Sequence, residues 1–157
     1  MQGKSRPPAT VGEAIQRMDA YVALGLIGQQ EVAQALGVNV TDLTCLGHVL
    51  GAGEEPLSAG DLAERANLTT GAVTGVLNRL EKAGYAHRVP DPGDRRRVRV
   101  VADPDAAARL VELYGPFYAR LEQVFARYTP EETAVIADWF AHAAEAARAH
   151  LDALRAR

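Results

Sequence analysis

The segment LSAGDLAERANLTTGAVTGVLNRLEKAGY, residues 57–85, decides the fold class of this chain. Ser58 opens a capping box, so we expect a short helix to begin there and to end in a turn at Asn67. A second helix is expected to begin at Thr69 or Thr70, because apolar residues follow at helical spacing. These residues are Val73, Val76, Leu77 and Leu80. Two short helices joined by a turn of a few residues are typical of a helix-turn-helix.

Polar side chains occupy the face of the second helix opposite this apolar stripe. Hydroxyl, amide and guanidinium groups read base edges in the major groove of DNA, where a helix-turn-helix inserts the start of its second helix. A glycine costs about 0.5–1 kcal/mol relative to alanine inside a helix, and close approach of the backbone to DNA is one compensation. The residues that we expect at a DNA interface are Ser58, Thr69, Thr70, Gly71, Thr74, Asn78 and Arg79. The alternative is the solvated side of an ordinary amphipathic helix.

The next segment, YAHRVPDPGDRRRVRVVA at residues 85–102, predicts a β-hairpin, because two β-prone runs flank a loop of proline, aspartate and glycine. Strand alternation places Val98 and Val100 on the inner face and Arg97 and Arg99 on the outer face. A narrow, electronegative minor groove would stabilise arginines at such a tip. The candidate DNA contacts in the hairpin are Arg88, Arg95, Arg96 and Arg97. The alternative is an ordinary solvated run of arginines.

Positive charge is concentrated in this part of the chain. Residues 69–102 carry seven basic and three acidic side chains, a net charge of +4, although the 157-residue chain has a formal net charge of −3. The remainder therefore carries −7. Such asymmetry favours local binding to a nucleic acid over general attraction to polyanions.

Helices are expected on both sides of the hairpin and helix-turn-helix. Thr41 is expected to cap the helix before them, and Asp103 and Thr129 the two helices after them. Gly115 and Pro116 should kink or briefly break the first of these two. The fold class is mainly α with a small β-hairpin wing. The expected organisation is a disordered tail at 1–10, an N-terminal dimerisation helix at 11–36, a winged helix-turn-helix region at 41–102 and C-terminal dimerisation helices at 103–157.

The outer helices carry more apolar surface than they can cover themselves, which favours a homodimer. The aromatic residues among them could also line a ligand site, but such a stripe at helical spacing is more often core or interface. The residues expected at the dimer interface are Ile15, Met18, Val22, Phe117, Leu121, Val135, Trp139, Phe140 and Leu151.

Several function classes are disfavoured. No phosphate loop, nucleophile signature or metal-like carboxylate pair is recognisable, so we expect no enzyme activity, no cofactor and no metal site. Cys45 is the one cysteine, and His48 lies one turn away, which is more typical of a helix core than of a metal ligand pair. The single thiol and the missing secretory signal suggest the cytoplasm, and no run is long and apolar enough for a membrane span.

With residues 57–85, the triplet DRR at 94–96 and helices on both sides, the sequence resembles the MarR (multiple antibiotic resistance regulator) family of winged helix-turn-helix transcription factors, over nearly all of residues 11–154. The resemblance implies a homodimer with interlocking terminal helices, and Asp94 bracing the wing arginines. It also implies a repressor released by a phenolic or other small aromatic effector. The positions that match the recognition helix and wing are Thr70, Thr74, Asn78, Arg95 and Arg96.

The function expected from these observations is sequence-specific binding to a pseudo-palindromic site in double-stranded DNA by a homodimer. One rival is a small-molecule or protein interaction module that keeps the fold without reading DNA. A weaker rival is an oxidant sensor that acts through Cys45.

Overall fold

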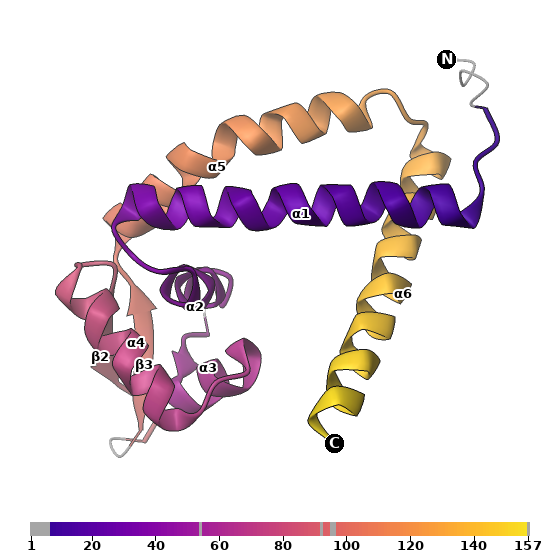
Figure 1. The fold of residues 1–157 in the computed structure, drawn as a ribbon. Helices are drawn as coiled ribbons and strands as arrows, with labels where there is room; N and C mark the ends of the chain where they lie inside the picture. The colour runs from indigo at the N-terminus through magenta and orange to yellow at the C-terminus, as the bar shows by residue number, and fades with distance from the viewer. Residues whose placement is uncertain (1–6, 54, 92, 95–96, 157) are drawn as a thin grey trace. The chain divides into compact units, whose positions relative to one another are not determined.

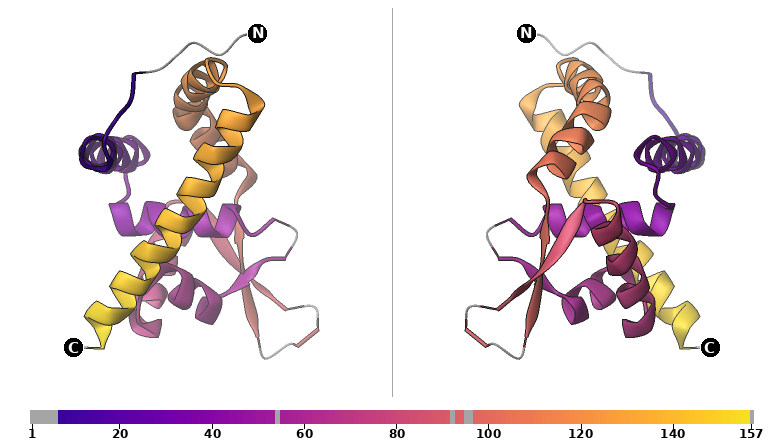
Figure 2. Two further views of the ribbon diagram at one scale, coloured as in Figure 1. Left: turned by 90° about the vertical axis from the view of Figure 1, so that its right-hand side faces the viewer. Right: turned by 90° about the vertical axis from the view of Figure 1, so that its left-hand side faces the viewer.

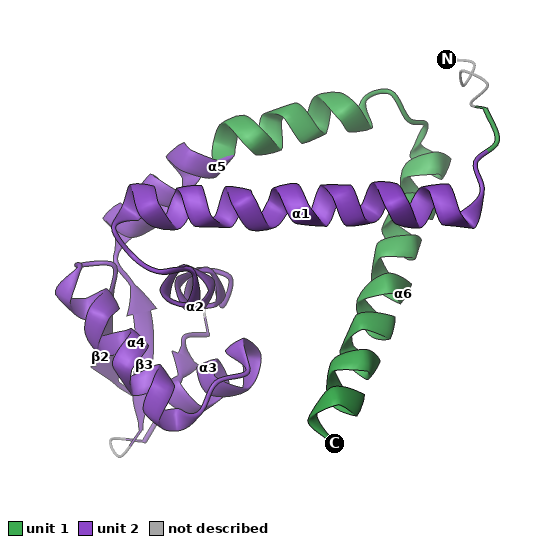
Figure 3. Cartoon of the chain, in the orientation of Figure 1, with its two compact units in different colours: residues 1–8, 115–157 green, residues 9–114 purple. Residues whose placement is uncertain are grey.

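The computed structural model describes residues 7–53, 55–91, 93–94 and 97–156. Contacts divide the chain into two compact units, which Figure 3 distinguishes by colour. One unit comprises residues 9–114, and the other comprises residues 1–8 and 115–157. No helix among the described residues is long and apolar enough to cross a membrane.

The structure is mainly helical with one small sheet, as the sequence predicts (Figure 1). The helices are α1 (Val11–Leu36), α2 (Val40–Leu50), α3 (Ala59–Ala66), α4 (Thr70–Lys82), α5 (Pro104–Phe125) and α6 (Pro130–Arg155). The strands are β1 (Leu57–Ser58), β2 (Ala86–Pro90) and β3 (Val98–Ala102).

Local capping explains where most helices begin. Thr10, Ser58 and Thr129 each head a complete capping box, in which the side chain of the third helical residue also bonds back to the cap. The expectation for α2 was wrong, because the helix begins two residues earlier. Its cap is Asn39, whose side chain accepts a hydrogen bond from the backbone N–H of Asp42.

A left-handed residue makes the turn between α3 and α4. Asn67 ends α3 with φ 55° and ψ 49°, and its backbone N–H still bonds to carbonyls of that helix. The Thr69 side chain then accepts a hydrogen bond from the N–H of Ala72 at 3.2 Å and starts α4. Asparagine tolerates this backbone conformation better than most residues do, since its short polar side chain bonds locally. The expected helix-turn-helix is therefore present.

The core of the 9–114 unit forms where α4 contacts α2, α3 and β2. All four apolar residues of the α4 stripe are buried, as the spacing predicts. The largest fully buried side chains in this unit include Leu46 of α2, Leu62 of α3 and Val100 of β3. Only the last turns of α1 reach this core, through Ala33 and Leu36.

The hairpin belongs to a three-stranded antiparallel sheet of order β1-β3-β2. The sequence predicts β2 and β3, which run side by side in both views of Figure 2, but not the two-residue strand β1. In the register, Ser58 of β1 lies opposite Arg99, and Arg88 of β2 lies opposite Val100. Val100 is buried as expected, whereas Val98 is exposed, so the expectation that both valines pack inward was wrong for Val98.

The second unit contains the end of α5 and all of α6. Of the expected kink or brief break at Gly115 and Pro116, the break is absent, because Pro104–Phe125 form one helix, although the boundary between the compact units falls at Gly115. Proline removes one helical N–H, which weakens the helix there without ending it. Of the expected tail at 1–10, residues 1–6 lie outside the described residues and Thr10 is the cap of α1.

The turn at Asn67 generates a stability prediction. Replacing Asn67 by valine should lower the free energy of unfolding by about 1–2 kcal/mol, because a β-branched residue is strained in the left-handed region. Asn67→Gly should stay within about 0.5 kcal/mol of the parent protein, because glycine adopts this conformation without strain. Urea unfolding at one fixed protein concentration measures both. Equal losses in the two variants would mean that the side chain, not the backbone conformation, matters at this turn.

Candidate DNA-binding surface

The outer face of α4 presents the side chains that the sequence assigned to base reading. Thr70, Gly71, Thr74 and Asn78 are exposed, while the apolar stripe on the opposite side is buried. The Thr74 hydroxyl donates to the Thr70 carbonyl at 3.0 Å, which leaves its oxygen lone pairs and its methyl group on the surface. The structure thus brings three residues with reading chemistry onto one exposed helical face.

Two of the expected interface residues use their hydroxyls in helix caps. The Ser58 hydroxyl donates to Asp61 at 2.7 Å and accepts from the Asp61 N–H at 3.1 Å. The Thr69 hydroxyl accepts from Ala72. Their observed role is to begin α3 and α4.

Arg79 lies on the exposed side of α4, but its guanidinium is bound to another helix. Its Nε bonds to both carboxylate oxygens of Asp42 at 3.2 and 3.0 Å, and Nη2 bonds to Oδ1 at 2.7 Å. Asp42 is only 2 % exposed, whereas the Arg79 side chain is 52 % exposed. The carboxylate hydrogen bonds raise the pKa of Arg79. The sequence placed this arginine as a base reader, and the structure places it as the partner of a buried carboxylate.

Arg88 of β2 lies against α4 and contacts three of its residues. It pairs with the carboxylate of Glu81, and its Nη2 donates to Asn78 Oδ1 at 3.0 Å and to the Thr74 carbonyl at 3.4 Å. Its backbone N–H also donates to Glu81 at 3.0 Å. Because Oδ1 of Asn78 receives this bond, the orientation of the Asn78 amide is determined, with its NH2 group left to donate elsewhere.

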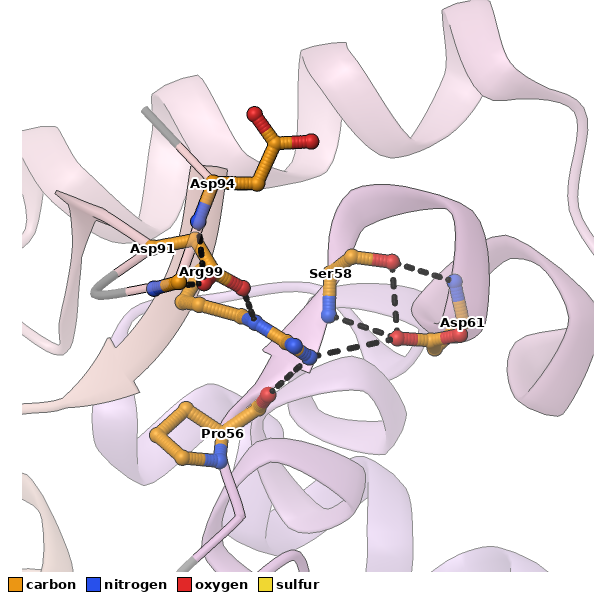
Figure 4. Close-up of polar contacts among 7 residues, drawn as sticks. Pro56, Ser58, Asp61, Asp91, Asp94 and Arg99 are labelled. Carbon is orange, nitrogen blue, oxygen red and sulfur yellow. Dashed lines mark hydrogen bonds and ion pairs between the residues drawn. The ribbon is translucent and has the colours of Figure 1, made fainter. Parts of the chain in front are cut away.

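The turn between β2 and β3 is organised by Asp91, which is only 7 % exposed. Asp91 Oδ1 accepts hydrogen bonds from the N–H groups of Gly93 and Asp94, at 2.7 and 3.1 Å, and its other oxygen pairs with Arg99 (Figure 4). These bonds, chiefly the one from Arg99, lower the pKa of Asp91. Arg97 is exposed beyond this turn. The expected wing residues Arg95 and Arg96 lie outside the described residues.

The residues expected at a dimer interface expose much apolar surface on α1, α5 and α6. Seven of the nine are exposed, and Met18 and Leu121 are half-buried. Trp139 and Phe140 contact each other edge to face, with ring centroids 5.2 Å apart. Exposed apolar side chains of this size and number are typical of a surface that contacts another chain.

Cys45 and His48 lie on α2, where the thiol is fully buried. Burial raises the pKa of Cys45, and neighbouring Asp42 raises it further, so the reactive thiolate is disfavoured. Among the residues described, no three His, Cys, Asp or Glu side chains are grouped as metal ligands would be.

Sequence reasoning missed four charged residues that organise this surface, namely Asp42, Glu81, Asp91 and Arg99. One signal was available for Asp42, because it lies four residues before Leu46 and seven before Val49, which places this carboxylate on the apolar side of α2. A buried charge on such a stripe requires a partner. Which arginine serves as that partner could not be read from spacing, because Arg79 is 37 residues away.

Comparisons with known proteins agree with this architecture. The model of the MarR family matches residues 36–97. A Bacillus subtilis (strain 168) protein named as the uncharacterized HTH-type transcriptional regulator YcgE is 37 % identical over 126 residues, which cover 80 % of each chain. The HTH-type transcriptional repressor YetL of the same organism is 29 % identical over 76 residues, covering 48 % of this chain and 46 % of YetL.

Solved structures show the same fold at low sequence identity. A MepR mutant from a clinical isolate of S. aureus has a TM-score of 0.69 and 14 % identity, covering 88 % of this chain and 99 % of its own. Another S. aureus MepR mutant, bound to an oligodeoxyribonucleotide, has a TM-score of 0.57 and 18 % identity, with the same coverage. Apo MarR of E. coli has a TM-score of 0.57 and 20 % identity, covering 87 % of this chain and 98 % of its own.

The family model and the relative YcgE place this winged helix-turn-helix chain among transcriptional regulators. The chain belongs to the MarR family, as its sequence resemblance indicated.

The pairing of Arg79 with Asp42 predicts that Arg79 stabilises the fold, whereas Thr74, on the same helix, does not. Arg79→Ala should lower the free energy of unfolding by about 1–3 kcal/mol, because the buried Asp42 carboxylate loses its partner. Thr74→Ala should change it by less than about 0.5 kcal/mol, because that side chain is exposed. Chemical denaturation measures both. If Arg79→Ala is as harmless as Thr74→Ala, the contact with Asp42 does not stabilise the fold.

Proposed function

We propose that this MarR-family regulator is a homodimeric repressor that binds a pseudo-palindromic operator and is released by a small aromatic effector. Each α4 would enter a major groove, and each β2–β3 hairpin would place arginines in the adjacent minor groove. The observation that carries the proposal is the exposed row of Thr70, Thr74 and Asn78 on α4, above a fully buried apolar stripe.

The geometry of this row supports base reading. Thr70 and Thr74 lie in the first half of α4, the part of a recognition helix that reaches base edges. Among the described residues, the NH2 group of Asn78 has no hydrogen-bond partner, while Arg88 occupies its carbonyl oxygen. An amide held in this way can donate to an acceptor such as purine N7 or O6 in the major groove. The S. aureus MepR mutant bound to an oligodeoxyribonucleotide supports DNA as the ligand of this fold.

A dimer is supported by the exposed apolar side chains of α1, α5 and α6. Two copies related by a twofold axis would present two α4 helices, and an operator would then carry two half-sites about one helical turn, roughly 34 Å, apart. The name of YetL, a transcriptional repressor, supports repression as the output. The effector follows from the family resemblance, and a panel of phenolic compounds added to a DNA-binding assay would test it.

Selection from random duplexes tests the DNA-binding proposal. The purified protein should enrich an inverted repeat, and Arg95→Ala/Arg96→Ala should weaken binding and lower the slope of log affinity against log salt by about 1 for each lost phosphate contact. The matched control is Arg120→Ala/Arg148→Ala, which removes the same charge from α5 and α6. Control and parent should behave alike. A folded dimer that enriches no sequence would favour the interaction-module alternative.

Light scattering at several protein concentrations tests the dimer. Trp139→Glu should shift the mass toward that of a monomer, because it would bury a charge in the interface. Ala134→Glu is the control, since it adds the same charge to an exposed position of the same helix that lies about 100° or more round the axis from Val135, Trp139, Phe140 and Leu151. A monomeric parent protein, or a Trp139→Glu variant that stays dimeric, would contradict this interface.

A further inference from the structure

Arg99 connects the hairpin to the helix-turn-helix through three partners. Its Nε pairs with Asp91 at the turn, its Nη1 donates to the Pro56 carbonyl at 2.9 Å, and Nη1 lies 3.9 Å from Asp61 Oδ2 (Figure 4). Pro56 immediately precedes β1, and Asp61 belongs to the first turn of α3. One guanidinium therefore joins β3, the β2–β3 turn and the start of α3.

The two carboxylate partners are themselves held in place. Asp91 is almost fully buried, and its second oxygen receives the N–H groups of Gly93 and Asp94. Asp61 closes the α3 capping box, with bonds of 2.8 Å from the Ser58 N–H and 2.7 Å from its hydroxyl. Because Asp91 and Asp61 have little freedom of their own, their contacts with Arg99 restrain the β2–β3 turn relative to the start of α3.

The surroundings of Arg99 are unfavourable for a DNA contact. The side chain is only 30 % exposed, and two carboxylates surround its single positive charge. A phosphate that approached this group would also approach Asp91 and Asp61, and like charges repel. Arg97, two residues earlier in the chain, is exposed and suits a phosphate better.

We propose that Arg99 is a positioning residue that fixes the β2–β3 hairpin relative to the helix-turn-helix. It thereby fixes the distance and angle at which the wing and the recognition helix α4 contact DNA. The proposal rests on the proposed function, in which the wing contacts the operator. It assigns to Arg99 a role different from that of the neighbouring arginines in the same basic run.

Replacing Asp91 by asparagine distinguishes positioning from direct contact, because the two roles predict opposite signs. If Arg99 bound DNA, Asp91→Asn would free it and remove a negative charge, so operator affinity would rise. If Arg99 positions the wing, Asp91→Asn removes its anchor and affinity should fall by about tenfold, as it should in Arg99→Gln. Asp105→Asn removes an exposed carboxylate at the start of α5 and reports the effect of charge alone.

A double-mutant cycle then shows whether the loss of operator affinity in Arg99→Gln depends on the wing arginines. In the Arg95→Ala/Arg96→Ala background, Arg99→Gln should change affinity by less than about twofold, because the contacts that it positions are already gone. The full loss in this background would show that Arg99 acts independently of the wing. Arg97→Gln is the matched variant for charge, and it should instead lower the salt slope in the parent by about 1.

The assay is operator binding measured by fluorescence anisotropy, with circular dichroism to confirm that each variant is folded. If Arg99→Gln does not fold, Asp91→Asn, which removes the same contact from the other side, takes its place in the cycle. Tighter binding by Asp91→Asn, or additive losses in the cycle, would overturn the positioning role while leaving the proposed function intact. Absence of operator binding by the parent protein would overturn both.

Discussion

The burial of one side of α4 is the constraint on which the rest of this structure depends. Val73, Val76, Leu77 and Leu80 are each at most 1 % exposed, and burying such a side chain contributes about 1.5–3 kcal/mol. An exposed ion pair contributes about 0–1 kcal/mol, so no surface charge could rotate the helix against this stripe. The orientation of α4 determines which residues face outward, and hence which can meet DNA.

Charged contacts refine the arrangement that the core establishes. Arg79 joins α4 to α2, Arg88 joins β2 to α4, and Arg99 joins β3 to the segment before β1. Each contact crosses a boundary between elements that the apolar core already holds near each other. Of the five basic side chains that the structure describes in residues 69–102, three therefore have carboxylate partners within the protein. The net charge of +4 for this segment already counts Glu81 and Asp91, so of these three pairings only that of Arg79 with Asp42, which lies outside the segment, reduces the excess of positive charge further.

The helix boundaries were predictable because the interactions that set them are local. A capping box joins residues three positions apart, so Ser58 and Thr129 could be recognised in the sequence. The errors arose where a local pattern allowed two answers, as at Asn39 and Thr41. Strand alternation failed for Val98, since it says which residues share a face but not how far the covering core extends.

The sequence by itself determined the fold class, the helix-turn-helix, the hairpin and the exposed face of α4, because periodicity and caps act over a few residues. Only the tertiary structure decided which arginines are bound to carboxylates and carbonyls within the protein and which are exposed. Arg79 and Asp42 are 37 residues apart, and Arg99 and Pro56 are 43 apart. Folding of the core brings these partners together, and nothing in their local sequence distinguishes Arg99 from the exposed Arg97. The physical reason is that a hydrogen bond depends on proximity in space, which the burial of distant apolar residues creates.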